Sequence, residues 1–153
     1  MNKTIILENS NADMILELIS KLNYTHPNSK WLFYDIDLEI FEHKEYSGIG
    51  IQTEEQLMDR FIKNVSNNDI MILRYDEIEK IFKNTISIIF GIIICFDENQ
   101  YIDRDLKPMV GEALKELPIM KHSLCELRIF EELELDIYIR DDINFLSNEN
   151  LKV

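Results

Sequence analysis

The chain has 153 residues, and its 29 acidic residues outnumber its 16 basic residues to give a formal net charge of −13 at pH 7. A hydrophobic content of 46% excludes a disordered chain in spite of this charge, and the length fits one domain with a real core. The charge also argues against a nucleic-acid partner, because phosphates repel carboxylates. We therefore expect a single globular domain over residues 1–153.

Neither end nor middle of the chain reads as a targeting or membrane segment. The first apolar run ends at Leu7, far short of the core of a signal peptide. The longest apolar stretch, Ile86 to Phe96, is too short for the ~20 residues of a membrane-spanning helix. Cys95 and Cys125 show no metal-type spacing and are interpreted as reduced, packed thiols. These features predict a cytoplasmic protein with no membrane partner.

The first half of the chain alternates between strand and helix patterns. Apolar spacing predicts a strand over 4–7, a helix over 11–22 with Ser10 as its N-cap, a strand over 31–41 and a helix over 54–66. The last of these opens with Thr53-Glu54-Glu55-Gln56, which matches a capping box.

The second half ends in strands. We expect a strand over 70–75, a short helix over 76–82, a strand over 86–96, a helix over 106–117 and a hairpin of 124–130 with 133–140. The strand over 86–96 is apolar on both faces, which is typical of the middle of a covered sheet. The order predicts an α+β (or mixed α/β) fold with a central mixed β-sheet and three to four helices, and residues 144–153 are expected to fray.

Two of the predicted strands alternate between apolar and acidic residues. In the first strand, Leu32, Tyr34, Ile36, Leu38 and Ile40 are expected on the core face, and Trp31, Phe33, Asp35, Asp37, Glu39 and Phe41 on the solvent face. In the last strand, the apolar face carries Leu133, Leu135, Ile137 and Ile139, and the solvent face carries Glu132, Glu134, Asp136, Tyr138 and Arg140.

We expect these two solvent faces to be near neighbours in the sheet and to form one acidic surface with aromatic anchors. Like charges opposed across a sheet are destabilising, so a cationic partner would account for them. The predicted partner-binding residues are Trp31, Phe33, Asp35, Asp37, Glu39, Glu42, Glu132, Glu134, Asp136, Tyr138, Asp141 and Asp142.

Motifs for catalysis are weak by comparison. Asp35, Asp37 and Glu39 have the alternation that an oxygen-ligand Mg²⁺ site would need, but a hydrated strand face has the same pattern. His122 and Cys125 are three apart, which places them on opposite faces of a strand. We predict no catalytic, cofactor-binding or metal-binding residue, and no enzymatic activity.

In size, acidity and lack of a catalytic motif the chain resembles bacterial toxin-immunity proteins as a class. This resemblance is one of composition and implies a small cytoplasmic binding protein that occludes a basic partner, such as a nuclease-type toxin domain. A toxin that grips nucleic acid presents lysines and arginines, which an acidic surface can cover after fast, electrostatically steered association. Two alternatives stay open: an enzyme or ligand-binding domain with a carboxylate cluster at 35–43, including His43, and an acidic adaptor subunit of a larger assembly.

Overall fold

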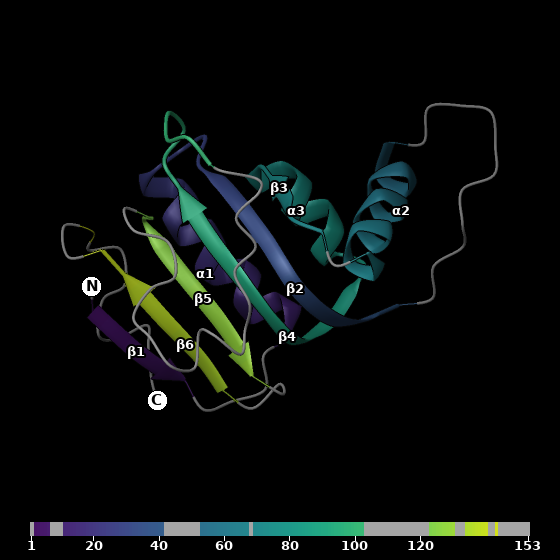
Figure 1. Ribbon diagram of the computed structural model, residues 1–153, viewed down its shortest axis with the longest axis horizontal. Coiled ribbons are helices and arrows are strands. Elements are labelled where there is room, and N and C mark those ends of the chain that lie inside the picture. Colours follow the sequence, from purple (N-terminus) through teal and green to yellow (C-terminus); the bar gives the residue numbers. More distant parts are fainter. Residues whose placement is uncertain are drawn as a thin grey trace.

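The computed structural model describes residues 2–6, 11–41, 53–67, 69–102, 123–130, 134–140 and 143. Along this part of the chain the elements are β1 (Asn2–Ile6), α1 (Ala12–Thr25), β2 (Lys30–Ile40), α2 (Thr53–Ser66), β3 (Met71–Leu73), α3 (Tyr75–Phe82), β4 (Thr85–Phe96), β5 (Cys125–Phe130) and β6 (Glu134–Ile139), as Figure 1 shows. The predicted helix over 106–117, the turn at 131–132 and the tail over 144–153 lie outside the described residues.

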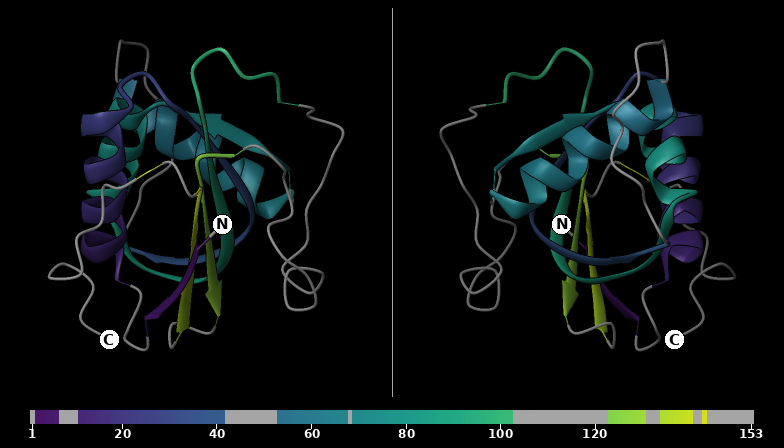
Figure 2. Two further views of the ribbon diagram at one scale, coloured as in Figure 1. Left: turned by 90° about the vertical axis from the view of Figure 1, so that its left-hand side faces the viewer. Right: turned by 90° about the vertical axis from the view of Figure 1, so that its right-hand side faces the viewer.

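The described strands form one six-stranded sheet in the order β1-β6-β5-β4-β2-β3. All of the described strand pairs are antiparallel, including the predicted β5–β6 hairpin. The two longest strands, β2 and β4, are strongly bent along their length (Figure 2). The predicted α+β fold with a central sheet is confirmed, but the described part of the sheet is antiparallel and not mixed as predicted.

β4 lies in the middle of the sheet and is covered on both faces, as its continuous apolar run predicts. Ile93 and Cys95 belong to a large core that also contains residues from all three described helices. Ile92 and Ile94 belong to a smaller core on the opposite face. We call these the helix-side core and the second core. Such two-sided burial is typical of an inner strand.

The helices are anchored to the helix-side core by aromatic and aliphatic side chains. Phe33 of β2 makes edge-to-face contacts with Phe61 of α2, at 6.0 Å between ring centroids, and with Phe82 of α3, at 6.2 Å. α1 begins one residue later than predicted: the side chain of Asn11 accepts a hydrogen bond from the Met14 amide at 2.8 Å and caps the helix. The cap satisfies a backbone donor that would otherwise lack an intrahelical partner.

A β-bulge in β2 contradicts the predicted assignment of its faces. Tyr34 is the register partner of Ile92 and Asp37 that of Phe90, so Asp35 and Ile36 together stand opposite Gly91. Asp35 adopts the left-handed conformation, with φ of 53°. An extra residue in one strand reverses the side-chain alternation beyond it. As a result, Leu32 and Tyr34 lie in the second core, whereas Ile36 and Leu38 pack in the helix-side core.

Candidate functional site

The two acidic strands do not form one surface. In the sheet, β2 and β6 are separated by β4 and β5. The expectation that they are near neighbours is therefore wrong. The hairpin order was predictable, but the insertion of β5 beside β4 depends on long-range pairing that local patterns do not encode.

The aromatic residues expected as surface anchors on β2 are core residues instead. Trp31 and Phe33 are each 1% exposed and lie in the helix-side core. Their burial has a physical reason: the first half of β2 is an inner strand that has β3 on one side and β4 on the other. Beyond the bulge Asp37 pairs with Phe90, which packs against the second core, so Asp37 does not share a face with Trp31 and Phe33.

On β6, the residues expected at the surface are also buried. Asp136 is 5% exposed and Tyr138 is 4% exposed. Their register partners on β5 are Arg128 and Glu126, respectively, which are fully buried. The assignment of Asp136 and Tyr138 to a partner-binding surface is therefore wrong. The alternating pattern of this hairpin predicts one covered face, whereas the described sheet is buried on both faces here.

Glu126, Arg128 and Tyr138 form a buried polar cluster on the second face of the sheet. Arg128 Nε donates to Glu126 Oε2 at 2.5 Å, and Arg128 Nη1 donates to the Tyr138 hydroxyl at 3.3 Å. The guanidinium also stacks on the Tyr138 ring, with Cζ 4.3 Å from the centroid. The ion pair offsets the desolvation of two charges, and such a pair is strongly destabilising when one partner is removed. We interpret the cluster as structural because its charged side chains have no exposed surface to offer a ligand.

This cluster could have been found from the sequence by one signal. Glu126 and Arg128 have opposite charges and are two residues apart in a strand that is otherwise apolar. Residues i and i+2 of a strand share a face, so such a pair can be mutually neutralised within a core.

Of the other residues predicted to bind a partner, some are described by the structure and some lie outside the described residues. Glu134 is half-buried at the start of β6, and Asp35 is half-buried at the bulge. Glu42, His43, Glu132, Asp141 and Asp142 lie outside the described residues. The acids of β2 beyond the bulge are therefore the predicted site residues that the structure places at the surface.

Asp37 and Glu39 are exposed near the end of β2, and Phe41 follows them at 55% exposure. Ile86, at the start of the paired strand β4, is 37% exposed. The Phe41 amide donates to the Asn84 carbonyl at 3.0 Å, which joins the two strands at this end. We call Asp37, Glu39, Phe41 and Ile86 the β2–β4 tip.

No neighbour within the described part of the chain neutralises the carboxylates of the tip. Within the described ranges, neither Asp37 nor Glu39 has a side-chain hydrogen bond or an ion pair. Among the described strands, β3 pairs with β2 only from Trp31 to Phe33, and none pairs with that edge of β2 farther along. The tip thus combines unneutralised acids, exposed apolar surface and an open strand edge.

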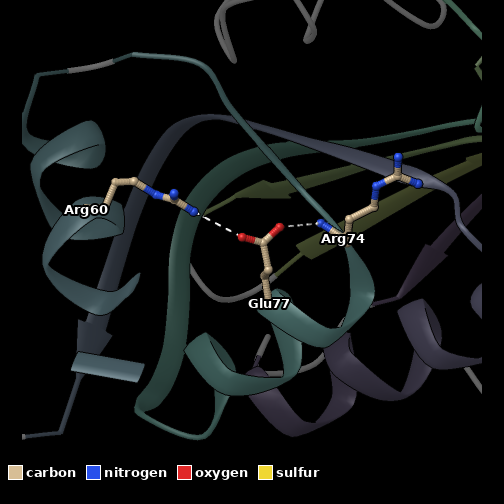
Figure 3. A network of polar contacts seen from close by, with 3 residues as sticks. All are labelled: Arg60, Arg74 and Glu77. Atoms are coloured by element: carbon tan, nitrogen blue, oxygen red, sulfur yellow. Dashed lines mark hydrogen bonds and ion pairs between the residues drawn. The ribbon is translucent and has the colours of Figure 1, made fainter. Parts of the chain in front are cut away.

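The surface of α2 and α3 differs because its charges are matched. Arg60 on α2 and Glu77 on α3 form an ion pair at 3.0 Å, and the other oxygen of Glu77 accepts a hydrogen bond from the Arg74 amide at 3.1 Å (Figure 3). Lys80 joins Arg60 and Glu77 in lining a shallow open depression between the two helices. Both signs of charge meet here, so this surface has no preference for a cationic partner.

Comparisons with known proteins leave the chain without a family assignment: no protein-family model, curated protein or solved structure matches it. Among the described side chains, no group of three or more His, Cys, Asp or Glu is arranged to hold a metal ion. Within the same part of the chain, no helix has the length and apolar character to cross a membrane.

Proposed function

We propose that this protein binds a basic partner protein through the β2–β4 tip, and that it acts as an immunity protein that neutralises a nuclease-type toxin. The observation that carries the proposal is the pair of exposed carboxylates, Asp37 and Glu39, that have no ion-pair partner among the described residues. The overall net charge of −13 acts in the same direction.

Electrostatics gives the tip its expected role. Carboxylates that have no ion-pair partner among the described residues, on a negatively charged molecule, attract lysines and arginines over a distance of about a Debye length, ~8–10 Å at physiological salt. Such attraction raises association rates more than it raises equilibrium affinity. Fast capture suits an inhibitor that must occupy a toxin before the toxin meets its substrate.

Exposed apolar surface and the open strand edge supply the short-range contacts. Aromatic side chains are the most frequent anchors of protein interfaces, and Phe41 is more than half exposed beside the two acids. An extended segment of the partner can also pair with the open edge of β2 through main-chain hydrogen bonds. We therefore expect the partner to present a basic, extended segment.

The test uses two variants with the same change in net charge. In the tip variant, Asp37→Lys and Glu39→Lys reverse the two tip carboxylates. In the control variant, Glu17→Lys and Glu98→Lys reverse two exposed acids of α1 and of the turn after β4. The unaltered protein and the two variants are each immobilised and exposed to lysate of the cell from which the protein comes, and the proteins that salt elutes are identified. Each captured protein is then co-expressed with the unaltered form, the tip variant or the control variant.

The proposal predicts a basic protein that the unaltered and control forms retain and the tip variant loses. Expression of that protein alone should arrest growth, and co-expression of the unaltered form, but not the tip variant, should restore it. Equal retention by the tip variant and the control would refute a role for the tip. A retained protein that is not toxic would refute the immunity function while leaving the binding surface intact.

A further inference from the structure

Cys95 and Cys125 lie directly opposite each other on neighbouring antiparallel strands. Cys95 of β4 and Cys125 of β5 are register partners. Both are free thiols, buried in the helix-side core, and hence on the same face of the sheet. The sequence gives no hint of this pairing, because the two residues have neither CxxC spacing nor any other shared motif.

Register partners in an antiparallel sheet have the separation that a disulfide requires. Their Cα atoms are about 4.5–5.5 Å apart, depending on whether the pair is hydrogen-bonded. Disulfides form across Cα separations of about 4.4–6.8 Å. Joining the two sulfurs therefore requires side-chain rotation, with no displacement of β4 relative to β5.

The pair lies at the end of both strands. Cys95 is the penultimate residue of β4, and Cys125 is the first residue of β5. Strand ends open locally at a lower free-energy cost than strand centres, so a small oxidant can reach this pair without global unfolding. Nearby, the indole Nε1 of Trp31 and the hydroxyl of Ser123 are buried without a hydrogen-bond partner, within the described part of the chain. This end of the core is thus more polar than its centre.

We propose that Cys95 and Cys125 are the site of a reversible oxidation that links β4 to β5 by a disulfide, with a hydroperoxide as the oxidant. The sulfur of one cysteine, as the thiolate, attacks an oxygen of the peroxide and breaks the O–O bond, which forms a sulfenic acid and, after proton transfer, releases one water. The sulfur of the other cysteine then displaces the sulfenic hydroxyl, which forms the S–S bond and releases a second water. Two thiols and one hydrogen peroxide thus yield one disulfide and two waters, with the thiols oxidised by two electrons in total.

The surroundings of both thiols oppose their ionisation in the closed state. Burial raises the pKa of Cys95 and of Cys125, and the Cys125 thiol and the Glu126 carboxylate, respectively, raise these two pKa values further. Thiols held protonated in this way react slowly in the closed state. The pair therefore resists mild oxidation and responds when the strand ends open.

The experiment treats the full chain with hydrogen peroxide, quenches it with an alkylating agent, and compares it with an untreated sample. We expect the intact mass, measured before alkylation, to fall by about 2 Da, both thiols to disappear when titrated in denaturant, and non-reducing digestion to yield a peptide that contains both cysteines. Dithiothreitol should restore both thiols. The melting temperature should rise on oxidation, because the link closes the chain between residues 95 and 125.

Cys95→Ala and Cys125→Ala are the matched controls. Neither should form the intramolecular link or show the rise in melting temperature. The inference is overturned if the peroxide-treated protein retains both thiols. It is also overturned if the treated protein only gains oxygen atoms at each cysteine, or if it forms disulfide-linked dimers. These results come from the unaltered chain, so they decide the question even if a variant does not fold. They do not depend on the proposed partner binding.

Discussion

Ile36 packs directly over the Cα of Gly91, where a methyl group on Gly91 would overlap with the Cδ1 atom of Ile36. The contact lies at the bulge, because Asp35 and Ile36 together stand opposite this glycine. The end of the Ile36 side chain fills the space beside residue 91, whose backbone angle is not one that favours glycine. The bulge and the glycine are therefore one structural feature, which positions the second half of β2 and the tip acids.

Gly91→Ala should lower the free energy of unfolding by about 1–3 kcal/mol, as overpacking of a core does. In an Ile36→Val background, which removes Cδ1, the same substitution should cost less than about 1 kcal/mol. Urea denaturation of the four proteins in this double-mutant cycle measures the coupling. An equal cost in both backgrounds would show that the contact does not explain the glycine.

The buried ion pair on β5 gives a second prediction about stability. Arg128→Met removes the arginine that is paired with the buried Glu126 carboxylate and should cost about 3–5 kcal/mol. The double variant Glu126→Leu/Arg128→Met removes both charges and should be more stable than Arg128→Met alone. Chemical denaturation monitored by circular dichroism provides the comparison. The single variant Glu126→Leu completes the comparison. If the stability lost by the double variant equals the sum of the losses in Arg128→Met and Glu126→Leu, the two charges do not compensate each other.

The two buried thiols predict a loss of stability at alkaline pH. Their pKa values are raised by burial above the usual value of 9.0, so above pH 9 the unfolded chain releases protons that the folded chain retains. The free energy of unfolding is thus unaffected by these groups below pH 9 and falls above it, by up to about 1.4 kcal/mol per pH unit for each thiol. Cys95→Ala/Cys125→Ala should flatten this part of the profile between pH 9 and pH 10.5, roughly the interval before lysines titrate. An unchanged slope would contradict the burial of the thiols.

The two contacts of Glu77, with the Arg60 side chain and with the Arg74 amide, should contribute differently to the free energy of unfolding. Glu77→Ala removes both the Arg60 ion pair and the acceptor of the Arg74 amide, and should cost about 0.5–2 kcal/mol through loss of the helix cap. Arg60→Ala removes only the ion pair, whose arginine is mostly exposed, and should cost less than about 1 kcal/mol. Thermal unfolding of the two variants measures the difference. A larger loss of stability in Arg60→Ala than in Glu77→Ala would contradict the prediction.

Patterns in the sequence predicted the helices and strands more successfully than they predicted which face of each strand is buried. The helices α1, α2 and α3, the central strand β4 and the β5–β6 hairpin all follow from apolar periodicity and capping residues. Periodicity also predicts which residues share a face, but a single left-handed residue at Asp35 reversed the alternation halfway along β2. Nothing about an aspartate between Tyr34 and Ile36 indicates a bulge locally.

The candidate site was only partly predictable for a related reason. Alternation of acidic and apolar residues predicts two faces, but it does not tell whether the acidic face is covered. On β2 the tip acids are exposed, whereas on β6 Asp136 is buried opposite Arg128. Strand order also decided the pairing of Cys95 with Cys125, and strand order is a property of contacts distant in sequence.

The most direct test of the account is the association rate of the captured basic protein with three forms: the unaltered chain, the Asp37→Lys/Glu39→Lys variant and the Glu17→Lys/Glu98→Lys control, measured by stopped flow from about 0.01 M to about 1 M salt. Steering by the β2–β4 tip predicts that the tip variant associates roughly tenfold more slowly or worse than the control at low salt, and that the three rates converge at high salt. Equal slowing of the tip variant and the control at low salt would contradict the account, because the effect would then follow from net charge and not from the tip.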